Sequence, residues 1–432
     1  MATTRLLSKS PKLRAWPIGI VPPYLLRDVL FAARFANGDW AVGQGSGTPT
    51  FTRATTATYI DPADGLIKSA ASGQARFERN GLLMEGQRTN LFLHTEALDN
   101  AAGWGLSNST ISANAAVAPD GAATADKVVE NSTASVQHGF SSLDHTRTSG
   151  ADQVTTLFAK AAERTWIILE GALGGFARQW FDIGNGVLGT STQSASASVL
   201  GSKITALPNG WYRCEMRWRE TNPGTTVADR FWITTGDGVL SYDGDGSSGA
   251  YFWGMQVEDN VSFASSYIPT TTATVTRNQD KLTYPSANNI LAAEGTLHLV
   301  GTTLGLANAT AFDSRGNPRT DGVATEHNLL GHIIMSVFSG SGETGSHNET
   351  SDVYVVDVPK AHGVAWEVDN FGNFVSGVEV GTDTSGAAPT AQNTMNVGDR
   401  SQGIQPWYGH LRHLIILNRR LSEGEAGQLA VR

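Results

Sequence analysis

Short runs in which apolar and polar residues alternate recur along most of this chain, each closed by a tight-turn sequence. Residues 155–159, 180–183 and 230–233 follow this pattern, and the second run leads into the turn Asn185-Gly186. An alternation of period two places side chains on opposite faces of a β-strand, and Asn-Gly is typical of a two-residue hairpin turn. Charged residues make up only 16% of the chain, whereas glycine contributes 48 residues. The sequence therefore predicts an all-β fold of many short strands.

At 432 residues the chain is long enough for more than one buried core. The strand runs group into two β-sandwiches of jelly-roll or lectin-like type, preceded by an N-terminal arm. The expected segments are an anchor arm at 1–36, a small β connector at 37–90, the first sandwich at 91–270, an extended linker at 271–290 and the second sandwich at 291–432. Two short helices are also expected, one at 25–35 and one at 421–429 with Ser422 as its N-cap.

The first segment differs in composition from the rest of the chain. Residues 1–27 contain basic side chains but no acidic one, and several prolines interrupt any regular element. Other residues of this segment are too apolar for a free tail. The arm therefore docks either on a partner protein or on its own domain, and the sequence favours neither alternative. The residues expected to anchor it to a partner are Arg5, Lys9, Lys12, Arg14, Trp16 and Tyr24.

Net charge and cysteine content exclude several classes of protein. The formal net charge is −9 and no basic stripe follows the N-terminal segment, so no nucleic-acid partner is expected. Cys214 is the single cysteine, which excludes an intrachain disulfide and a cysteine-based metal site. No apolar run is long enough for a signal peptide or a membrane span. We therefore expect assembly in a reducing cytoplasm and no membrane insertion.

The sequence lacks the motifs of common enzyme classes, including the Gly-x-Ser-x-Gly nucleophile turn, the P-loop and the dinucleotide fingerprint. Glu367 and Asp369 lie two residues apart, as the acidic pair of sandwich-fold glycoside hydrolases does. Gly372, however, occupies the position at which those enzymes carry a third acid. Because glycoside hydrolysis requires two carboxyl groups flanking the scissile bond, we expect no enzymatic activity.

Three stretches resemble known protein families. Residues 51–59 (F-T-R-A-T-T-A-T-Y) and 81–91 (G-L-L-M-E-G-Q-R-T-N-L) resemble the R-A-S-x-A-x-Y and G-L-L-I-E-x-x-R-T-N signatures of phage tail or head fibre and spike proteins. The likeness continues in consistent order over residues 50–285, through a region similar to a carbohydrate-binding-module sandwich. Residues 409–422 resemble the end of a concanavalin A-like or laminin-G-like domain.

These resemblances imply a structural protein of a phage virion that attaches to the host surface by binding a glycan. They also imply that residues 1–36 anchor the chain to tail, baseplate or capsid proteins, and that the chain forms a homotrimer assembled in the host cytoplasm. Two alternatives stay open. The chain could be a purely architectural decoration or tail protein, or a virion-associated enzyme that degrades glycans.

Candidate ligand sites follow from side-chain chemistry. Sugar-binding sandwiches stack exposed aromatic rings on the apolar face of a pyranose, and Trp104, Trp407 and Tyr408 are the candidates in turn-rich segments. Each of them could instead belong to a core. Asp243 and Asp245 place two carboxylates in a glycine-rich loop, which suits Ca²⁺, although a solvated turn is the simpler interpretation. Apart from this calcium ion, no cofactor is expected.

Overall fold

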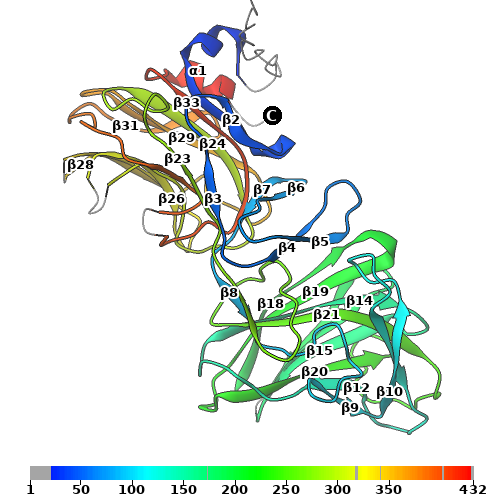
Figure 1. Ribbon diagram of the computed structural model, residues 1–432. Helices are drawn as coiled ribbons and strands as arrows, with labels where there is room; N and C mark the ends of the chain where they lie inside the picture. Colours follow the sequence, from blue (N-terminus) through cyan, green and yellow to red (C-terminus); the bar gives the residue numbers. More distant parts are fainter. Residues whose placement is uncertain (1–20, 173, 317–319, 341, 401–402, 430–432) are drawn as a thin grey trace, which may run out of the picture.

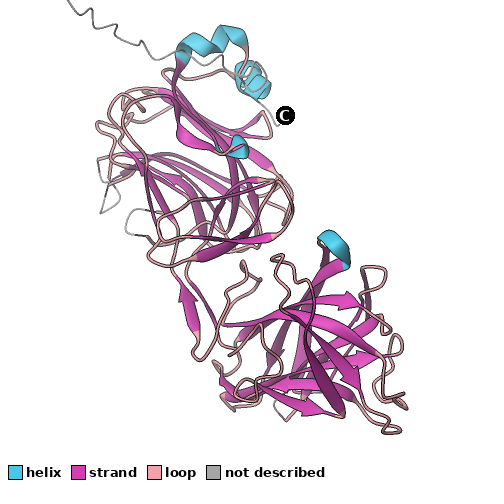
Figure 2. Ribbon diagram, turned by 45° about the vertical axis from the view of Figure 1, so that its right-hand side comes forward, coloured by secondary structure: helices cyan, strands magenta, loops and turns pink. Residues whose placement is uncertain are grey.

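The computed structural model describes residues 21–172, 174–316, 320–340, 342–400 and 403–429. Within these ranges the chain forms two β-sandwiches joined by a narrow junction (Figure 1, Figure 2). The predicted all-β class with two sandwiches is confirmed. No helix in the described ranges is long and apolar enough to cross a lipid bilayer.

The first sandwich, drawn in cyan to green in Figure 1, consists of two antiparallel sheets. One sheet contains, in spatial order, β10 (Ser109–Ala116), β11 (Ala125–Glu130), β21 (Gly249–Asp259), β14 (Asp152–Ala161), β19 (Trp211–Glu220) and β18 (Ala197–Ala206). The other contains β17 (Val187–Gln193), β16 (Phe176–Asp182), β15 (Trp166–Ala172), β20 (Thr226–Thr234), β12 (His138–Ser142) and β9 (Trp104–Ser107), with β13 (His145–Thr146) beside β20. A short 3-10 helix, η3 (Pro208–Gly210), precedes β19.

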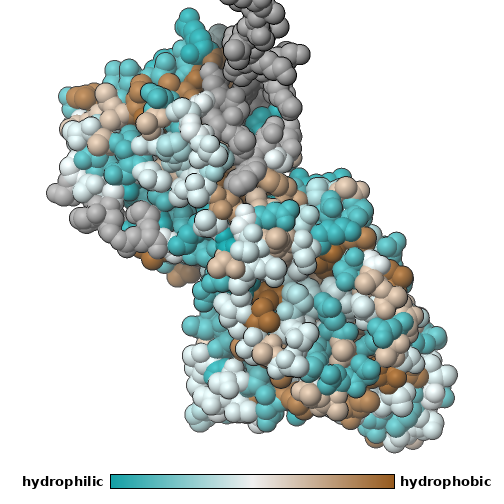
Figure 3. Space-filling view, viewed as in Figure 1, coloured by the Kyte–Doolittle hydropathy of each residue, from teal (hydrophilic) through white to brown (hydrophobic). Residues whose placement is uncertain are grey.

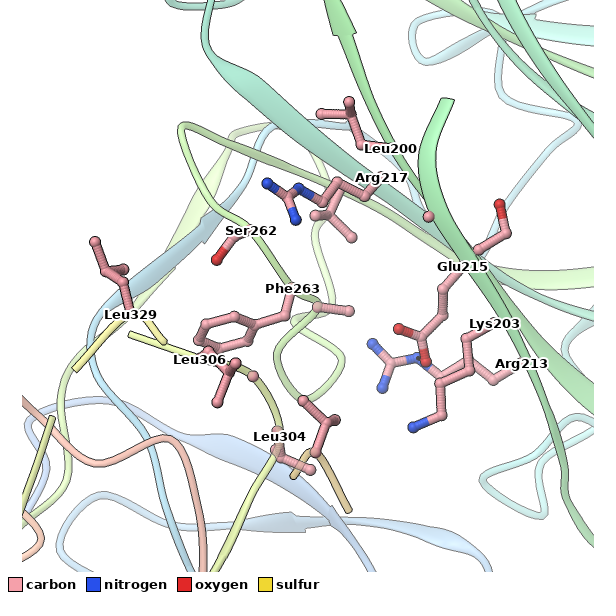
Figure 4. A pocket seen from close by; sticks show the side chains of 16 residues that line it. Leu200, Lys203, Arg213, Glu215, Arg217, Ser262, Phe263, Leu304, Leu306 and Leu329 are labelled. Atoms are coloured by element: carbon pink, nitrogen blue, oxygen red, sulfur yellow. Dashed lines mark ion pairs between the residues drawn. The ribbon is translucent and has the colours of Figure 1, made fainter. Parts of the chain in front are cut away.

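Strand β19 shows how the period-two pattern divides this sandwich into a core face and an outer face. Cys214 and Trp218 point inward and are fully buried, in the same cluster as the stacked rings of Phe140 and Phe231. The charged residues between them, such as Arg217, point outward because successive side chains of a strand lie on opposite faces. The outer face of β19 is therefore charged, and it faces the second sandwich (Figure 4).

The second sandwich also has two antiparallel sheets. One contains β2 (Asp39–Gln44), β1 (Val29–Arg34), β33 (Gly409–Leu417), β24 (Gly295–Thr303), β29 (Lys360–Trp366), β30 (Phe371–Val375) and β31 (Val378–Asp383), with β7 (Gly81–Met84) beside β33 and β6 (Arg76–Glu78) beside β7. The other contains β28 (Gly342–Glu349), β27 (Ile333–Ser339), β26 (Gly322–His327), β25 (Ala309–Asp313), β32 (Met395–Val397), β23 (Lys281–Tyr284) and β3 (Thr50–Thr52). One core of buried side chains, including Phe312 and Trp366, fills the space between them.

Chain segments on both sides of the first sandwich build the second. Strand β3 pairs with β23, where Phe51 lies opposite Leu282, and β7 pairs with β33, where Leu83 lies opposite His410. The first sandwich is therefore inserted within the second. The chain crosses the junction twice, in β8 (Arg88–Asn90) and β22 (Val275–Arg277), and these two strands pair with each other.

This insertion changes two of the expected segments. The stretch predicted as a small connector, 37–90, and the one predicted as a linker, 271–290, both contribute strands to the second sandwich. Such short strands cannot bury an apolar face alone, so they pair with a larger sheet. Besides the junction pair of β8 and β22, the hairpin of β4 (Ala57–Ile60) and β5 (Ile67–Ala70) stands apart, and its Ile67 packs against the first sandwich.

The described part of the predicted arm lies on its own domain. Arg5, Lys9, Lys12, Arg14 and Trp16 lie outside the described residues. From Val21 onward the segment packs on the second sandwich, through the 3-10 helix η1 (Pro23–Asp28), strand β1 and the 3-10 turn η2 (Phe35–Asn37). The helix predicted at 25–35 is mainly strand, because its alternating residues place Phe31 and Ala33 in the core.

The C-terminal helix is present as predicted. Helix α1 (Glu423–Ala426) begins after Ser422, whose backbone N–H donates to Glu425 Oε2 at 3.1 Å, and the 3-10 turn η4 (Gly427–Leu429) follows. Ser422 and Glu425 form a capping box, in which the N-cap residue and the residue three positions later satisfy each other's backbone groups. Tyr24, an expected anchor residue, is half exposed and donates its hydroxyl to Gln428 Oε1 at 2.9 Å. The start and the end of the described chain therefore lie side by side.

A network of buried charges lies at the junction. Asp280 accepts hydrogen bonds from Arg53 Nη1 at 2.8 Å and from Arg76 Nη2 at 2.5 Å. Glu85 pairs with Arg76 at 2.7 Å and with Arg277 at 2.8 Å. All five side chains are at most 1% exposed, so water screens none of these pairs.

The network joins the two sandwiches because one member comes from the first. Ser266, in the loop after β21, donates its backbone N–H and its hydroxyl to Glu85 at 2.8 and 2.7 Å. Its hydroxyl oxygen also accepts hydrogen bonds from Arg76 and Arg277. Burial alone would raise the pKa of Glu85, but the charges of Arg277 and Arg76 outweigh burial and hold this pKa well below its usual range. The carboxylate is therefore ionised in the folded protein.

Removing one charge from this network should destabilise the protein strongly. We predict that Arg76→Met lowers the free energy of unfolding by roughly 3–5 kcal/mol, because two buried carboxylates each lose a partner. Chemical denaturation of the full chain measures this effect. Lys203→Met is the control, since Lys203 and Asp357 also join the two sandwiches but are both about half exposed. We expect that variant to lower the free energy of unfolding by less than about 1 kcal/mol. An equal loss of stability in the two variants would contradict the claim that the buried network stabilises the protein more than an exposed ion pair does.

Candidate functional site

A cleft of about 710 Å³ lies between the two sandwiches, on the side where β18 and β19 face the second sandwich (Figure 4). Strands β18 and β19 form one wall, and the loop after β21 forms the floor with residues 304–306. Turns of the second sandwich supply the opposite rim. The space-filling view shows the two lobes with a waist between them (Figure 3).

The wall formed by the first sandwich is charged. Arg213, Glu215 and Arg217 alternate along β19, and Lys203 extends from the neighbouring β18. Arg217 donates Nε to Asp152 Oδ2 at 2.7 Å, and Arg213 donates Nη2 to the backbone carbonyl of residue 265 at 2.6 Å. These contacts anchor both guanidinium groups at the edge of the cleft, where Figure 4 shows them directed toward its interior.

The floor of the cleft is apolar and tightly packed. Phe263, from the first sandwich, lies against Gly305 of the second, and a Cβ atom at position 305 would come within 2.0 Å of the Phe263 ring. Behind this contact, Arg88 lies 5.1 Å from the centroid of Phe263 and 4.5 Å from that of Tyr408. The phenyl ring is therefore held between the two sandwiches while it still lines the cleft.

Large apolar side chains surround the opening. Leu329, in the turn between β26 and β27, is 62% exposed, and Leu200 and Val356 are each 39% exposed. A backbone hydrogen bond from Tyr354 to Gly331 at 2.8 Å holds the two turns of the second sandwich together. Exposed apolar residues that gather beside a cleft indicate a contact surface rather than a chance distribution.

This arrangement suits the binding of a ligand. An apolar floor with a few converging polar groups is the usual composition of a ligand site. Within the part of the chain that the structure describes, Glu215 is the only carboxylic acid among the lining residues, whereas glycoside hydrolysis requires a pair. The cleft can thus supply stacking, hydrogen bonds and charge to a bound molecule.

The structure contradicts both predicted tryptophan platforms. Trp104 is 3% exposed, and its ring packs edge-on against Phe92 and Phe140 within the first core. Trp407 is fully buried in the second core, where it contacts His327 and Tyr354. Both rings are in cores because the strands beside these turn-rich segments close over them, so neither can stack on a sugar.

Tyr408 lies behind the cleft rather than on an open surface. Its ring packs edge-on against Phe263, with centroids 5.0 Å apart, and its hydroxyl accepts a hydrogen bond from Arg88 at 3.1 Å. It therefore positions the phenyl ring that lines the cleft. A platform role for Tyr408 itself is not supported by this geometry.

The predicted calcium loop is held together by its own hydrogen bonds. Asp245 accepts from the backbone N–H groups of Ser247 and Ser248, both at 2.7 Å, and Asp243 accepts from that of Ser135 at 2.7 Å. Hydrogen bonds from Ser248 and Ser247 lower the pKa of Asp245. Across the described ranges, no group of three or more His, Cys, Asp or Glu residues could hold a metal ion. Calcium binding at this loop stays a prediction.

The acidic pair at 367–369 belongs to a turn. Glu367 and Asp369 are exposed, and Asp369 accepts a hydrogen bond from the backbone of Gly386 at 2.9 Å. Glu367 accepts a hydrogen bond from the side chain of Asn370 at 3.1 Å. Glu367 thus stabilises its own turn, and Asp369 ties that turn to the loop after β31.

Sequence reasoning missed the residues that line the cleft. The alternation of Arg213, Glu215 and Arg217 was visible, but the same pattern is typical of any solvated strand face. Nothing in the sequence around Phe263 indicated a ligand site, because its loop becomes the floor of the cleft only when the second sandwich packs against it. These residues come together through the junction and not through local sequence.

Fold and site together define an all-β protein of two sandwiches with an open cleft at their junction. Several solved structures are similar to it. The CBM40 domain of the Ruminococcus gnavus IT-sialidase bound to α2,3-sialyllactose is 14% identical, with 35% of this chain and 92% of that chain covered and a TM-score of 0.30. Domain 4 of AbnA, a GH43 extracellular arabinanase from Geobacillus stearothermophilus, in complex with arabinotriose, is also 14% identical, with 40% and 84% covered and a TM-score of 0.29.

Domains LG4-5 of the mouse laminin α1 chain are 12% identical, with 68% of this chain and 90% of that chain covered and a TM-score of 0.26. At these scores the comparisons carry no argument about what this chain binds, and the sugars named belong to those proteins. Neither a protein-family model nor a curated protein sequence matches this chain.

The contact between Gly305 and Phe263 gives a test of the cleft floor. We predict that Gly305→Ala lowers the free energy of unfolding by about 1–3 kcal/mol, because the new methyl group overlaps the phenyl ring and forces it to move. Gly201 is the matched control, since it lines the same cleft and a Cβ there meets nothing within 4 Å. Chemical denaturation measures both variants, and a neutral Gly305→Ala would contradict the tight packing of the floor.

Proposed function

We propose that this chain is a non-catalytic attachment protein of a phage particle and that it binds a host-surface glycan in the cleft between its two sandwiches. The observation that carries the proposal is the combination of the half-buried Phe263 ring with hydrogen-bonding side chains on the facing wall. A pyranose has an apolar C–H face that packs on an aromatic ring and hydroxyl groups that need polar partners. The cleft offers both kinds of contact within one site.

The phage role is supported by the sequence resemblance over residues 50–285. Arg53 and Glu85, in the two stretches that carry this resemblance, are both members of the buried network at the junction. Arg88, in the second stretch, stacks on Phe263. The resemblance therefore involves the residues that position the cleft. The virion anchor predicted at residues 1–36, the virion partners and the homotrimer belong to this proposal, and within that segment residues 21–36 pack on the second sandwich.

A purely architectural role is the second candidate, and the exposed leucines favour it. Leu329 and Leu330 are 62% and 67% exposed beside the cleft, and a neighbouring virion subunit could cover them. In that case the cleft would be a protein contact and no glycan would bind there.

Glycan binding can be tested with a panel of host-surface saccharides and the full chain. We predict binding that falls by about 10-fold or more in Phe263→Ala, because truncation removes the aromatic contact at the centre of the site. Phe176→Ala is the control, since Phe176 lies on β16, in the sheet that does not line the cleft. Absence of binding to every saccharide would contradict the proposal and favour the architectural role.

A further inference from the structure

The side chains directed into the cleft carry more positive than negative charge, although the chain as a whole has a net charge of −9. Lys203, Arg213 and Arg217 line the wall together with one carboxylate, that of Glu215. A concentration of one sign of charge in a low-dielectric cleft selects ligands of the opposite sign. The cleft is therefore positively charged although the protein as a whole is negatively charged, so the composition of the chain does not account for the charge of the cleft.

Arg217 is the residue best placed to receive an anion. Its Nε and Nη2 atoms face Asp152, which also accepts from Arg219 Nε at 2.5 Å, so one carboxylate is shared between two guanidinium groups. The pair of arginines therefore keeps one uncompensated positive charge. The Arg217 side chain is 36% exposed, and its Nη1 atom has no hydrogen-bond partner among the described residues. Figure 4 shows this end of the side chain in the cleft.

Two further polar groups of the wall are incompletely bonded. Arg213 Nε is buried and has no hydrogen-bond partner among the described residues, and the nearest carboxylate oxygen recorded for it is Glu215 Oε1, 3.8 Å away. No described residue donates a hydrogen bond to the carboxylate of Glu215, which is 16% exposed. Buried and half-buried polar groups are normally satisfied, so the carboxylate of Glu215, which is partly exposed, can accept hydrogen bonds from a ligand in the cleft.

Lys203 contributes less to this selectivity. Its ammonium pairs with Asp357 across the opening at 2.5 Å, and both side chains are about half exposed. Water and salt screen such a pair, and Asp357 compensates its charge. The argument for an anionic ligand therefore depends on Arg217, since Glu215 lies 3.8 Å from Arg213 Nε.

We propose that the cleft selects glycans that carry a carboxylated sugar, either a hexuronic or a sialic acid; this inference rests on the proposed function. A guanidinium group presents a planar fork of donors that matches a carboxylate, which makes Arg217 the receptor for the acid group. Glu215 accepts hydrogen bonds from sugar hydroxyls, and Phe263 packs on the C–H face of the ring. The three side chains line one cleft, so a single sugar unit can contact all of them.

Matched pairs of saccharides test this selectivity. The probes are an oligogalacturonate with its carboxyl-reduced form, and a sialylated trisaccharide with its desialylated form, each titrated against the full chain by calorimetry. We expect at least one acidic member to bind about 10-fold or more tightly than its neutral counterpart, the difference expected from a charge-assisted hydrogen bond. In Arg217→Gln this preference should fall below about 3-fold, while affinity for the neutral form stays within about 2-fold.

Two variants complete the design. Arg178→Gln removes an arginine from the sheet that does not line the cleft and should keep the full preference for the acid. Glu215→Gln should weaken the neutral member, because it alters the group that receives hydroxyls, and should weaken the acidic member less, because it also removes a negative charge from the cleft. A melting temperature within a few degrees of the wild type confirms that each variant is folded. If Arg217→Gln is not folded, Arg217→Met replaces it with the same expected loss of preference.

The outcomes separate the inference from the function on which it rests. Equal binding of acidic and neutral members in the wild type would overturn the acidic selectivity and leave glycan binding in place. A preference that survives the Arg217 variant would place the acid-binding group elsewhere and overturn the inference as well. Absence of binding to every member of both pairs and of the wider panel would contradict the proposed function itself.

Discussion

The buried ionic network at the junction is the interaction on which the rest of the structure depends. Its charged members come from residues 53–85 and 277–280, which lie on opposite sides of the inserted sandwich in the sequence, and Ser266 joins them from that sandwich. Moving the two sandwiches apart would break the hydrogen bonds of Ser266 to Glu85 and to two arginines of the network, and a buried charge that loses a partner is costly. The network therefore fixes one orientation of the two sandwiches, and with it the position of β19 opposite Phe263. The cleft exists because this orientation is fixed.

Local pattern was sufficient to predict the fold class but not the division into domains. The alternating runs predicted strands, and Ser422 predicted the start of the last helix, because both signals lie within a few residues. The pairing of β3 with β23 joins residues more than 200 positions apart, and no local signal encodes it. Residues 37–90 and 271–290 therefore looked like connectors, although they carry strands of the second sandwich and the two junction strands.

The residues of the candidate site could not be predicted from local sequence either. Trp104 and Trp407 stand in sequence surroundings typical of exposed loops, yet packing against distant strands buries both. Conversely, Arg213 and Arg217 have the pattern of an ordinary solvated strand face, and they become part of a site only through the neighbouring sandwich. The two stretches that resemble phage fibre proteins contain Arg53 and Glu85, for which the sequence alone indicated no role. The structure gives these residues a physical one, as charges that hold the junction.

The distance between the two sandwiches in solution tests this account most directly. Val187 and Val378 are exposed positions on different sandwiches, and a cysteine placed at each can carry a nitroxide label. Pulsed electron–electron double resonance then measures the distance between the two labels. The single cysteine does not interfere, because Cys214 is buried and burial raises the pKa of its thiol. A fixed junction predicts one narrow distance distribution that high salt leaves unchanged. A broad or multiple distribution in the wild-type chain would contradict the account.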